Sequence, residues 1–180
     1  MKTVSWDWLG EPLAVDFANT ILRAGADYRE LLGSGADVVS WARHEAGRVP
    51  LPAEHDADAR LEEIRTVRDD VFAVLAAAAA GEAFPRGPAA RLDLRARAHP
   101  VVAQLMGESI VAGGGGAVVE LLARVAAAAI ELARSDVAVG LCDAPSCGQL
   151  FVRARPNQSW CGPACGTRAR VARHAAARRG

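Results

Sequence analysis

Hydrophobic residues recur at helical spacing in two long segments of the chain. From about Asp58 to Ala80, apolar positions fall on one arc of a helix and charged residues cover the other side. The positions on this arc are Leu61, Ile64, Val67, Val71, Phe72 and Leu75. A second helix is predicted from about Ala117 to Arg134, with Val118, Leu121, Leu122, Val125 and Ala129 on one face. The pattern therefore favours a mostly helical body.

Shorter elements are predicted before and between these helices. Residues 13–15, Leu-Ala-Val, are compatible with a short strand, and residues 16–20 with a helix start or a tight turn. A short helix is expected from Asp37 to Ala46, where two prolines then follow. Another is expected around residues 88–98. Three tryptophans are expected in the core: Trp6, Trp8 and Trp41.

The last quarter of the chain has a different pattern. Residues 137–141 and 149–152 are predicted to form the two strands of a hairpin. A helix is predicted to begin near Pro163, because proline suits the first turn of a helix, and to continue through residues 169–177.

The boundary between the two patterns lies at Ser135-Asp136. We therefore expect a helical domain over residues 1–135 and a small module over residues 137–180. The fold class expected is mainly α, with a short β element in the helical domain and a hairpin followed by a helix in the module.

The four cysteines of the chain all lie in this module. Their spacing is Cys142-x4-Cys147, thirteen residues, then Cys161-x3-Cys165. Two closely spaced pairs separated by a spacer that lets the chain fold back are typical of a tetrahedral zinc site. Four thiolates would leave no open position for water, so one structural zinc ion is predicted, in a treble-clef-like finger. Two disulfides or four unpaired thiols are the alternatives.

The net charge of the chain is zero, but its basic and acidic residues are unevenly distributed along the sequence. From residue 142 onward the chain has seven arginines and one acid, Asp143, whereas the preceding 141 residues hold 14 basic and 20 acidic residues. Four thiolates and one Zn²⁺ would add −2 to the module, which still leaves it basic. The depletion of acids indicates an anionic partner for this end of the chain.

No secretory signal is recognised near Met1, and no apolar stretch reaches the roughly 18 residues that a membrane span requires. We therefore expect a cytoplasmic protein. Disulfides are rare in that reducing compartment, which favours metal binding by the cysteines.

The cysteine module resembles the CGNR-type zinc finger. The resemblance rests on Cys142, the segment Cys147-Gly-Gln-Leu-Phe151, Trp160-Cys161 and Cys165-Gly-Thr-Arg168. The sequence departs from the motif at Thr167, where the family has Asn. That departure leaves zinc ligation intact but removes any role of the Asn amide in base contacts or turn hydrogen bonding.

The segment Leu13-Ala-Val-Asp-Phe-Ala-Asn-Thr20 resembles the "LDFVNT" opening of the helical domain that accompanies this finger in bacterial proteins. The segments 31–32 and 37–41 agree with that domain. Together the two resemblances cover nearly the whole chain. They imply a stress-linked bacterial transcription regulator that binds DNA through its finger.

Helical geometry separates the arginines of the last helix. At 100° per residue, one side holds Arg170, Arg173 and His174, and the opposite side should pack inward. The inward side comprises Arg168, Val171, Ala172, Ala175 and Ala176. Arg168 is therefore as well suited to a structural role as to a DNA contact. Arg170 and Arg173 are the better DNA-binding candidates, with Arg153 and Arg155 as phosphate contacts; a solvated basic face without a partner is the alternative.

Other polar residues give weaker signals. Asp16 and Asn19 are a possible ligand pocket in the helical domain, although a turn or helix cap explains the same residues. His44, His55 and His99 lack metal-ligand spacing and are expected to have surface or capping roles. No catalytic arrangement is recognised, so we do not expect an enzyme.

The sequence thus favours a DNA-binding transcription regulator whose helical domain senses a signal or dimerises. The alternative is a zinc-stabilised protein–protein interaction module without sequence-specific DNA binding. A homodimer is expected for a regulator, because a single small finger buries little surface on DNA. The sequence does not identify a small-molecule effector.

Overall fold

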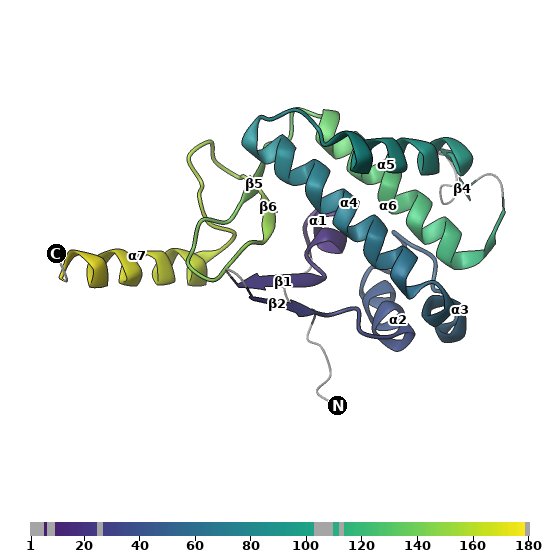
Figure 1. The fold of residues 1–180 in the computed structure, drawn as a ribbon, viewed down its shortest axis with the longest axis horizontal. Coiled ribbons are helices and arrows are strands. Elements are labelled where there is room, and N and C mark those ends of the chain that lie inside the picture. Colours follow the sequence, from purple (N-terminus) through teal and green to yellow (C-terminus); the bar gives the residue numbers. More distant parts are fainter. Residues whose placement is uncertain (1–5, 7–9, 25–26, 103–109, 112–113, 179–180) are drawn as a thin grey trace.

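The computed structural model describes residues 6, 10–24, 27–102, 110–111 and 114–178 (Figure 1). Helix accounts for 58% of the chain and the strands are short antiparallel pairs, which confirms the expected fold class. The helices are α1 (Leu13–Ala18), α2 (Gly35–His44), α3 (Glu54–Ala59), α4 (Leu61–Ala80), α5 (Arg86–Ala98), α6 (Gly116–Arg134) and α7 (Pro163–Ala177). The strands are β1 (Ile21–Ala24), β2 (Asp27–Glu30), β3 (Val101–Val102), β4 (Ile110–Val111), β5 (Val139–Leu141) and β6 (Leu150–Val152).

The long helices α4 and α6 form the core of the body with α1 and α5 (Figure 1). Both carry the predicted apolar faces: Ile64, Val71 and Leu75 of α4 and Leu121 and Leu122 of α6 are fully buried. The short helix α1 is buried on all sides between α4 and α6. None of the helices in the described part of the chain has the length and apolar composition needed to cross a lipid bilayer.

The helix predicted from Asp58 to Ala80 is in fact two helices, α3 and α4, which meet at Arg60. Arg60 leaves the helical conformation, with φ −117° and ψ 16°, and its carbonyl then accepts the first α4 hydrogen bond, from Ile64 N–H. Helix α3 turns away to pack on α2, where the Gly35 N–H donates to the Asp58 carboxylate. A Cβ at Gly35 would lie 2.3 Å from the Glu54 carbonyl oxygen, so this approach requires glycine.

The strand predicted at residues 13–15 is wrong, because these residues form α1. The Pro12 carbonyl accepts hydrogen bonds from Val15 and Asp16 and starts the helix. The hydrophobic periodicity of the sequence did not identify this helix, because the segment is buried on every side. A short apolar run does not distinguish a strand from a helix. The β element follows α1 as the hairpin of β1 and β2, with Ile21 opposite Glu30.

The remaining predictions differ from the structure mainly at element ends. Helix α2 begins at Gly35, two residues earlier than predicted, because the Ser34 hydroxyl accepts from the Asp37 N–H as an N-cap. Trp6 and Trp41 are buried, as expected, and Trp41 packs on Phe17 with ring centroids 5.1 Å apart. Trp8 lies outside the described residues.

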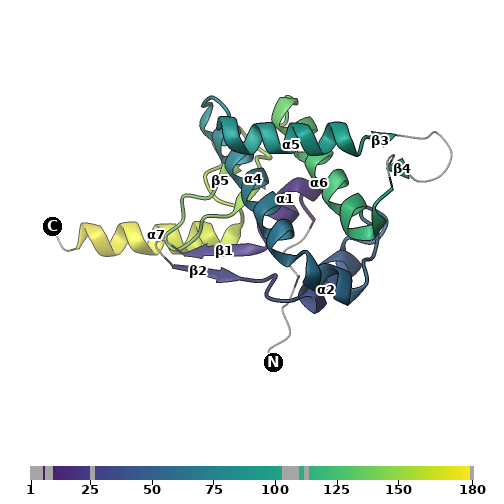
Figure 2. The same ribbon diagram turned by 45° about the vertical axis from the view of Figure 1, so that its right-hand side comes forward.

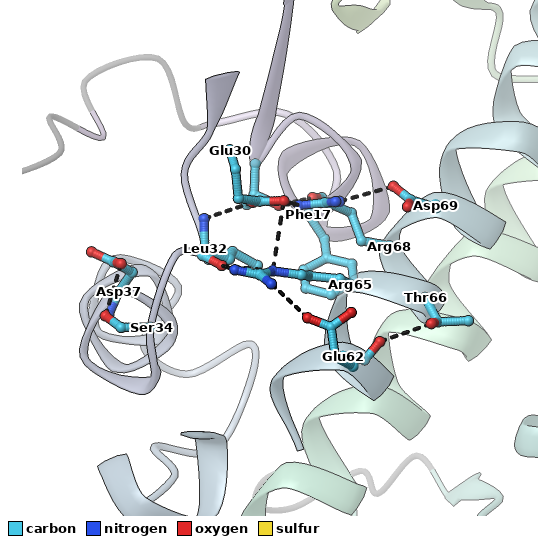
Figure 3. Close-up of polar contacts among 11 residues, drawn as sticks. Phe17, Glu30, Leu32, Ser34, Asp37, Glu62, Arg65, Thr66, Arg68 and Asp69 are labelled. Carbon is cyan, nitrogen blue, oxygen red and sulfur yellow. Dashed lines mark hydrogen bonds and ion pairs between the residues drawn. The ribbon is translucent and has the colours of Figure 1, made fainter. Parts of the chain in front are cut away.

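An ionic network joins β2 to α4 (Figure 3). The guanidinium of Arg68, 3% exposed, donates to both oxygens of Glu30 at 2.6 and 2.7 Å. The Glu30 carboxylate also accepts from the Leu32 N–H at 2.8 Å, and Arg65 donates to the Leu32 carbonyl. This network holds the first hairpin at the side of the body that faces the C-terminal module.

The β5–β6 hairpin lies between the body and α7. In its register Val139 pairs with Val152, Gly140 with Phe151 and Leu141 with Leu150. Val139 and Leu150 belong to the core of the body, whereas Phe151, on the other face of β6, belongs to a second core around the cysteines. Helix α7 then extends away from the body, in both views of the molecule (Figures 1 and 2).

The Glu30–Arg68 pair gives the first prediction. Arg68→Ala leaves the Glu30 carboxylate half-buried without its main cationic partner, so we expect the free energy of unfolding to fall by about 3 kcal/mol. Denaturant unfolding measures this loss. Arg60→Ala is the control, because Arg60 pairs with Glu63 at the surface and should cost less than about 0.5 kcal/mol. Equal costs for the two variants would contradict the prediction.

Candidate metal centre

The first cysteine pair is held by the turn between β5 and β6. Cys142 follows β5 directly, and its N–H donates to the Gln149 carbonyl at 3.0 Å. The Cys147 N–H donates to the Ala144 carbonyl at 3.0 Å, and Ser146 takes a positive φ of 58°. This tight turn brings both sulfur atoms to the same side of the hairpin.

The second pair is held by the start of α7. Cys161 lies just before the helix and Cys165 in its first turn, with Pro163 as the first helical residue. The Cys161 N–H donates to the Cys142 sulfur at 3.4 Å, which joins the two pairs. Free N–H groups and the positive end of the helix dipole favour thiolates at this position.

The four Sγ atoms lie within 4.8 Å of one another. Cys147 and Cys161 are separated by 3.9 Å, and Cys161 and Cys165 by 3.5 Å. Tetrahedral zinc with Zn–S bonds of about 2.3 Å requires sulfur separations of about 3.8 Å, whereas a disulfide needs about 2.05 Å. All four cysteines are free, so the geometry fits one structural zinc ion and excludes the disulfide alternative in this structure.

The thiols themselves need a cation. The hydrogen bond from Cys161 lowers the pKa of Cys147 to about 5. The same hydrogen bond, together with burial, raises the pKa of Cys161, and burial raises the pKa of Cys142. Cys147 therefore ionises more readily than Cys142 and Cys161, and a divalent cation bound between the cysteines would favour the thiolate form of its ligands.

Two family models match the chain. Residues 11–136 match the ABATE family, described as "Putative stress-induced transcription regulator", and residues 139–179 match the CGNR zinc finger. The chain belongs to the ABATE family. The resemblance read from the sequence is thus confirmed for both parts. No curated protein matches the sequence.

The motif residues of this ABATE protein support the metal centre. Arg168 donates to the Cys165 sulfur at 2.8 Å, so this arginine has a structural contact. Thr167, at the position of the family Asn, donates to the Pro163 carbonyl and accepts from Arg170.

The hairpin that carries the first cysteine pair requires glycine at position 140. A Cβ at Gly140 would lie 2.8 Å from both the Phe151 ring and Arg153 Nε.

The helical domain of the ABATE protein is tied to the finger by Asn19. Its amide nitrogen donates to the Leu150 carbonyl at 2.9 Å and its amide oxygen accepts from the Leu150 N–H at 2.9 Å, both in a buried setting. The Glu11 carboxylate accepts from the Val152 N–H at 3.0 Å. Both contacts continue the hydrogen-bond pattern of a sheet along the free edge of β6.

Asp16 is buried in α1, the short helix that ends just before Asn19. Its carboxylate accepts from the Gly10 and Glu11 N–H groups and from Arg48. Burial raises the pKa of Asp16 despite these donors, and burial raises the pKa of Glu45, which also pairs with Arg48, to about 7. Asp16 and Asn19 thus have structural partners, and the ligand pocket suggested for them stays a prediction.

The arginines named as DNA-binding candidates have different surroundings. Arg153 donates to the Gln158 carbonyl and stacks on Phe151, whereas Arg155 is exposed in the loop that follows β6. Arg170 and Arg173 are exposed on α7, with the Arg173 guanidinium 5.8 Å from the centre of the Trp160 ring. The structure therefore brings Arg170 and Arg173 to one exposed helix and uses Arg153 to brace the loop.

The inward face predicted for α7 is wrong in part. Val171 is 63% exposed, and Ala175 and Ala176 are exposed. Only the first turns of α7 pack on the finger, through Cys165 and Ala169, because the rest of the helix extends past the body. Helical periodicity gives the direction of a side chain but not whether a neighbour is there to cover it.

Metal binding gives the second prediction. We expect about one zinc per chain in the purified protein and a loss of most of it in Cys161→Ser, measured by elemental analysis. Structural zinc contributes on the order of 10 kcal/mol to folding, so this variant should also unfold at a lower temperature. Ser159→Ala, two residues away, should keep the metal. Full zinc content in Cys161→Ser would exclude the four-cysteine site.

The Asn19 contact gives the third prediction. Asn19→Ala leaves a buried N–H and a buried carbonyl of Leu150 without partners, at about 1–3 kcal/mol each. We expect the free energy of unfolding to fall by about 2–5 kcal/mol while the zinc content is unchanged. Asn157→Ala, in the exposed loop of the finger, is the control. Stability equal to wild type would show that the side chain does not support β6.

Proposed function

We propose that this ABATE protein is a cytoplasmic DNA-binding transcription regulator, with α7 as its main DNA contact and no catalytic activity. The observation that supports the proposal most is the position of α7. The helix stands clear of the body, has no acidic residue and exposes its arginines to solvent (Figures 1 and 2).

The dimensions of α7 suit a DNA groove. Every side chain from Arg170 to Arg178 is exposed except the half-buried Ala172. The helix has 15 residues, about 22 Å at 1.5 Å per residue. An α-helix with its side chains is about 10–12 Å wide and the major groove of B-DNA about 12 Å. The exposed end of α7 could therefore enter the groove without displacing another part of the chain.

The arginines on α7 are placed for two kinds of contact. Arg173 stacks against Trp160, which limits the side-chain freedom lost on binding. Arg170 lies on the same part of α7, and its guanidinium donates a hydrogen bond to the Thr167 hydroxyl. Planar guanidinium groups bind a guanine edge or a phosphate through paired hydrogen bonds. Arg155 and Arg178 would add phosphate contacts at either end of this surface.

A single finger of this size does not give a large interface. Single modules bury roughly 600–1,000 Å² on DNA, so we expect the regulator to bind as a homodimer on paired half-sites. Light scattering of the zinc-loaded protein measures its mass in solution.

The decisive experiment is selection of duplex fragments from a genomic pool by the zinc-loaded protein at near-physiological salt. Enrichment of a defined motif would establish sequence-specific binding, and paired half-sites would support the dimer. Recovery of no motif would refute the proposal and favour a protein-interaction module, for which the surface around the exposed Val171 of α7 would be the first to test.

The fourth prediction concerns the charges on α7. The double variant Arg170→Ala, Arg173→Ala should bind the selected duplex at least tenfold more weakly at 0.15 M salt. If both contact phosphates, the slope of log K against log salt should also fall by about 1.8, since each neutralised phosphate contributes about 0.9. Fluorescence anisotropy titrations at several salt concentrations measure both quantities.

A matched control separates local contacts from total charge. The double variant Arg43→Ala, Arg86→Ala removes the same charge from exposed positions on the helical body. We expect it to bind DNA nearly as tightly as wild type and to keep its zinc. Equal weakening in the two double variants would indicate diffuse attraction instead of contact by α7.

A further inference from the structure

The helical body contains a pocket between α4 and α5, away from Asp16 and Asn19. Its volume is about 530 Å³, within the range of roughly 300–1,000 Å³ that is usual for small-molecule sites. The two helices that form it lie side by side in both views (Figures 1 and 2). Its apolar wall consists of Val67, Leu92, Leu94 and Ala98.

The charged groups of the pocket neutralise one another. Arg91 donates to both oxygens of Asp70, at 2.8 and 2.5 Å, and Arg95 donates to Glu63 at 2.6 Å. A charged ligand would have to break one of these pairs and bury the partner that remains. The wall therefore favours a neutral ligand with a large apolar surface.

One polar atom of the wall lacks a partner. The Nδ1 atom of His99 is buried and makes no hydrogen bond within the described part of the chain. Because this atom is buried, a molecule in the pocket does not reach it, and His99 contributes ring surface to the wall. His99 is also the C-cap residue of α5, in agreement with the surface or capping role expected for it.

We infer that this pocket binds a neutral, mostly apolar small molecule, because its wall is apolar and its charged groups are already paired. The inference rests on the proposed function in one respect: in a regulator, such a ligand would be the effector. Helix α4 connects the two parts, because it forms one wall of the pocket and packs directly on β5 and β6 of the finger hairpin. A ligand that shifts α4 would therefore shift the base of the finger.

The test uses neutral 2-naphthol as the probe and 2-naphthoate as its charged counterpart. Equilibrium dialysis of the full, zinc-loaded chain should show saturable binding of 2-naphthol with Kd below about 100 µM, near −5.5 kcal/mol. 2-Naphthoate should bind at least fivefold more weakly, because a charged ligand has to separate one of the ion pairs of the pocket.

A second pair of variants locates the site. Ala98→Phe places a ring in the pocket and should weaken 2-naphthol binding at least tenfold. Ala90→Phe adds the same ring to an exposed position of α5 outside the pocket and should leave binding intact. Circular dichroism and zinc content confirm that both variants are folded.

The outcomes separate the pocket from the proposed function, because the dialysis contains no DNA. Absence of saturable binding, or equal binding by Ala98→Phe and Ala90→Phe, would overturn the inferred site even in a protein that binds DNA. Binding that follows the pocket variants supports the site even if no DNA motif is recovered. A change in duplex affinity of at least threefold at saturating 2-naphthol would further support its coupling to the finger.

Discussion

The β5–β6 hairpin is buried on both faces, and both cores of the protein depend on it. Residues alternate across a strand, so Leu150 packs into the helical body and Phe151 into the finger. Two strands of three residues are not stable on their own in water. The hairpin persists because Asn19 and Glu11 complete the hydrogen bonds of β6 on one edge and the metal centre fixes the turn that joins its strands.

This arrangement changes what the zinc ion stabilises. In an isolated finger, the free energy of metal binding folds the finger alone. Here Val139 and Leu150 are part of the main core, so a metal that fixes the hairpin also stabilises the helical domain. The sequence boundary at residues 135–137 separates two patterns, but packing continues across it. Helix α7 is consequently held in a set orientation to the body through Cys161 and Cys165, which a flexible linker would not provide.

The parts of the structure that the sequence predicted are those encoded by local spacing. The cysteine pairs lie within four or five residues of each other, and the faces of α4 and α6 repeat every three or four residues, so both can be read from the chain. The strand at residues 13–15 was wrong because burial on all sides erases that periodicity. The role of Asn19 was missed for a different reason: its partner, Leu150, is 131 residues away and contributes only backbone atoms, which leave no mark in the sequence. A polar residue inside an apolar segment was the available signal, and it indicated a special role without naming the partner.

The function proposed for the body depends on the way α4 is shared between the pocket and the finger hairpin. One stretch of this helix packs on the finger hairpin, and residues from Glu63 to Asp70 line the pocket with α5. A 20-residue helix moves largely as a rigid unit, because each of its hydrogen bonds would resist a local bend. Tightly packed cores respond to such a displacement by shifting between discrete arrangements instead of deforming smoothly. The buried Asn19 amide, bonded to both backbone groups of Leu150, resists any sliding of β6 past α1. Movement of α4 would therefore turn the hairpin, the metal centre and α7 together, which is what a regulator needs if occupancy of its body is to alter the angle at which its basic helix meets DNA.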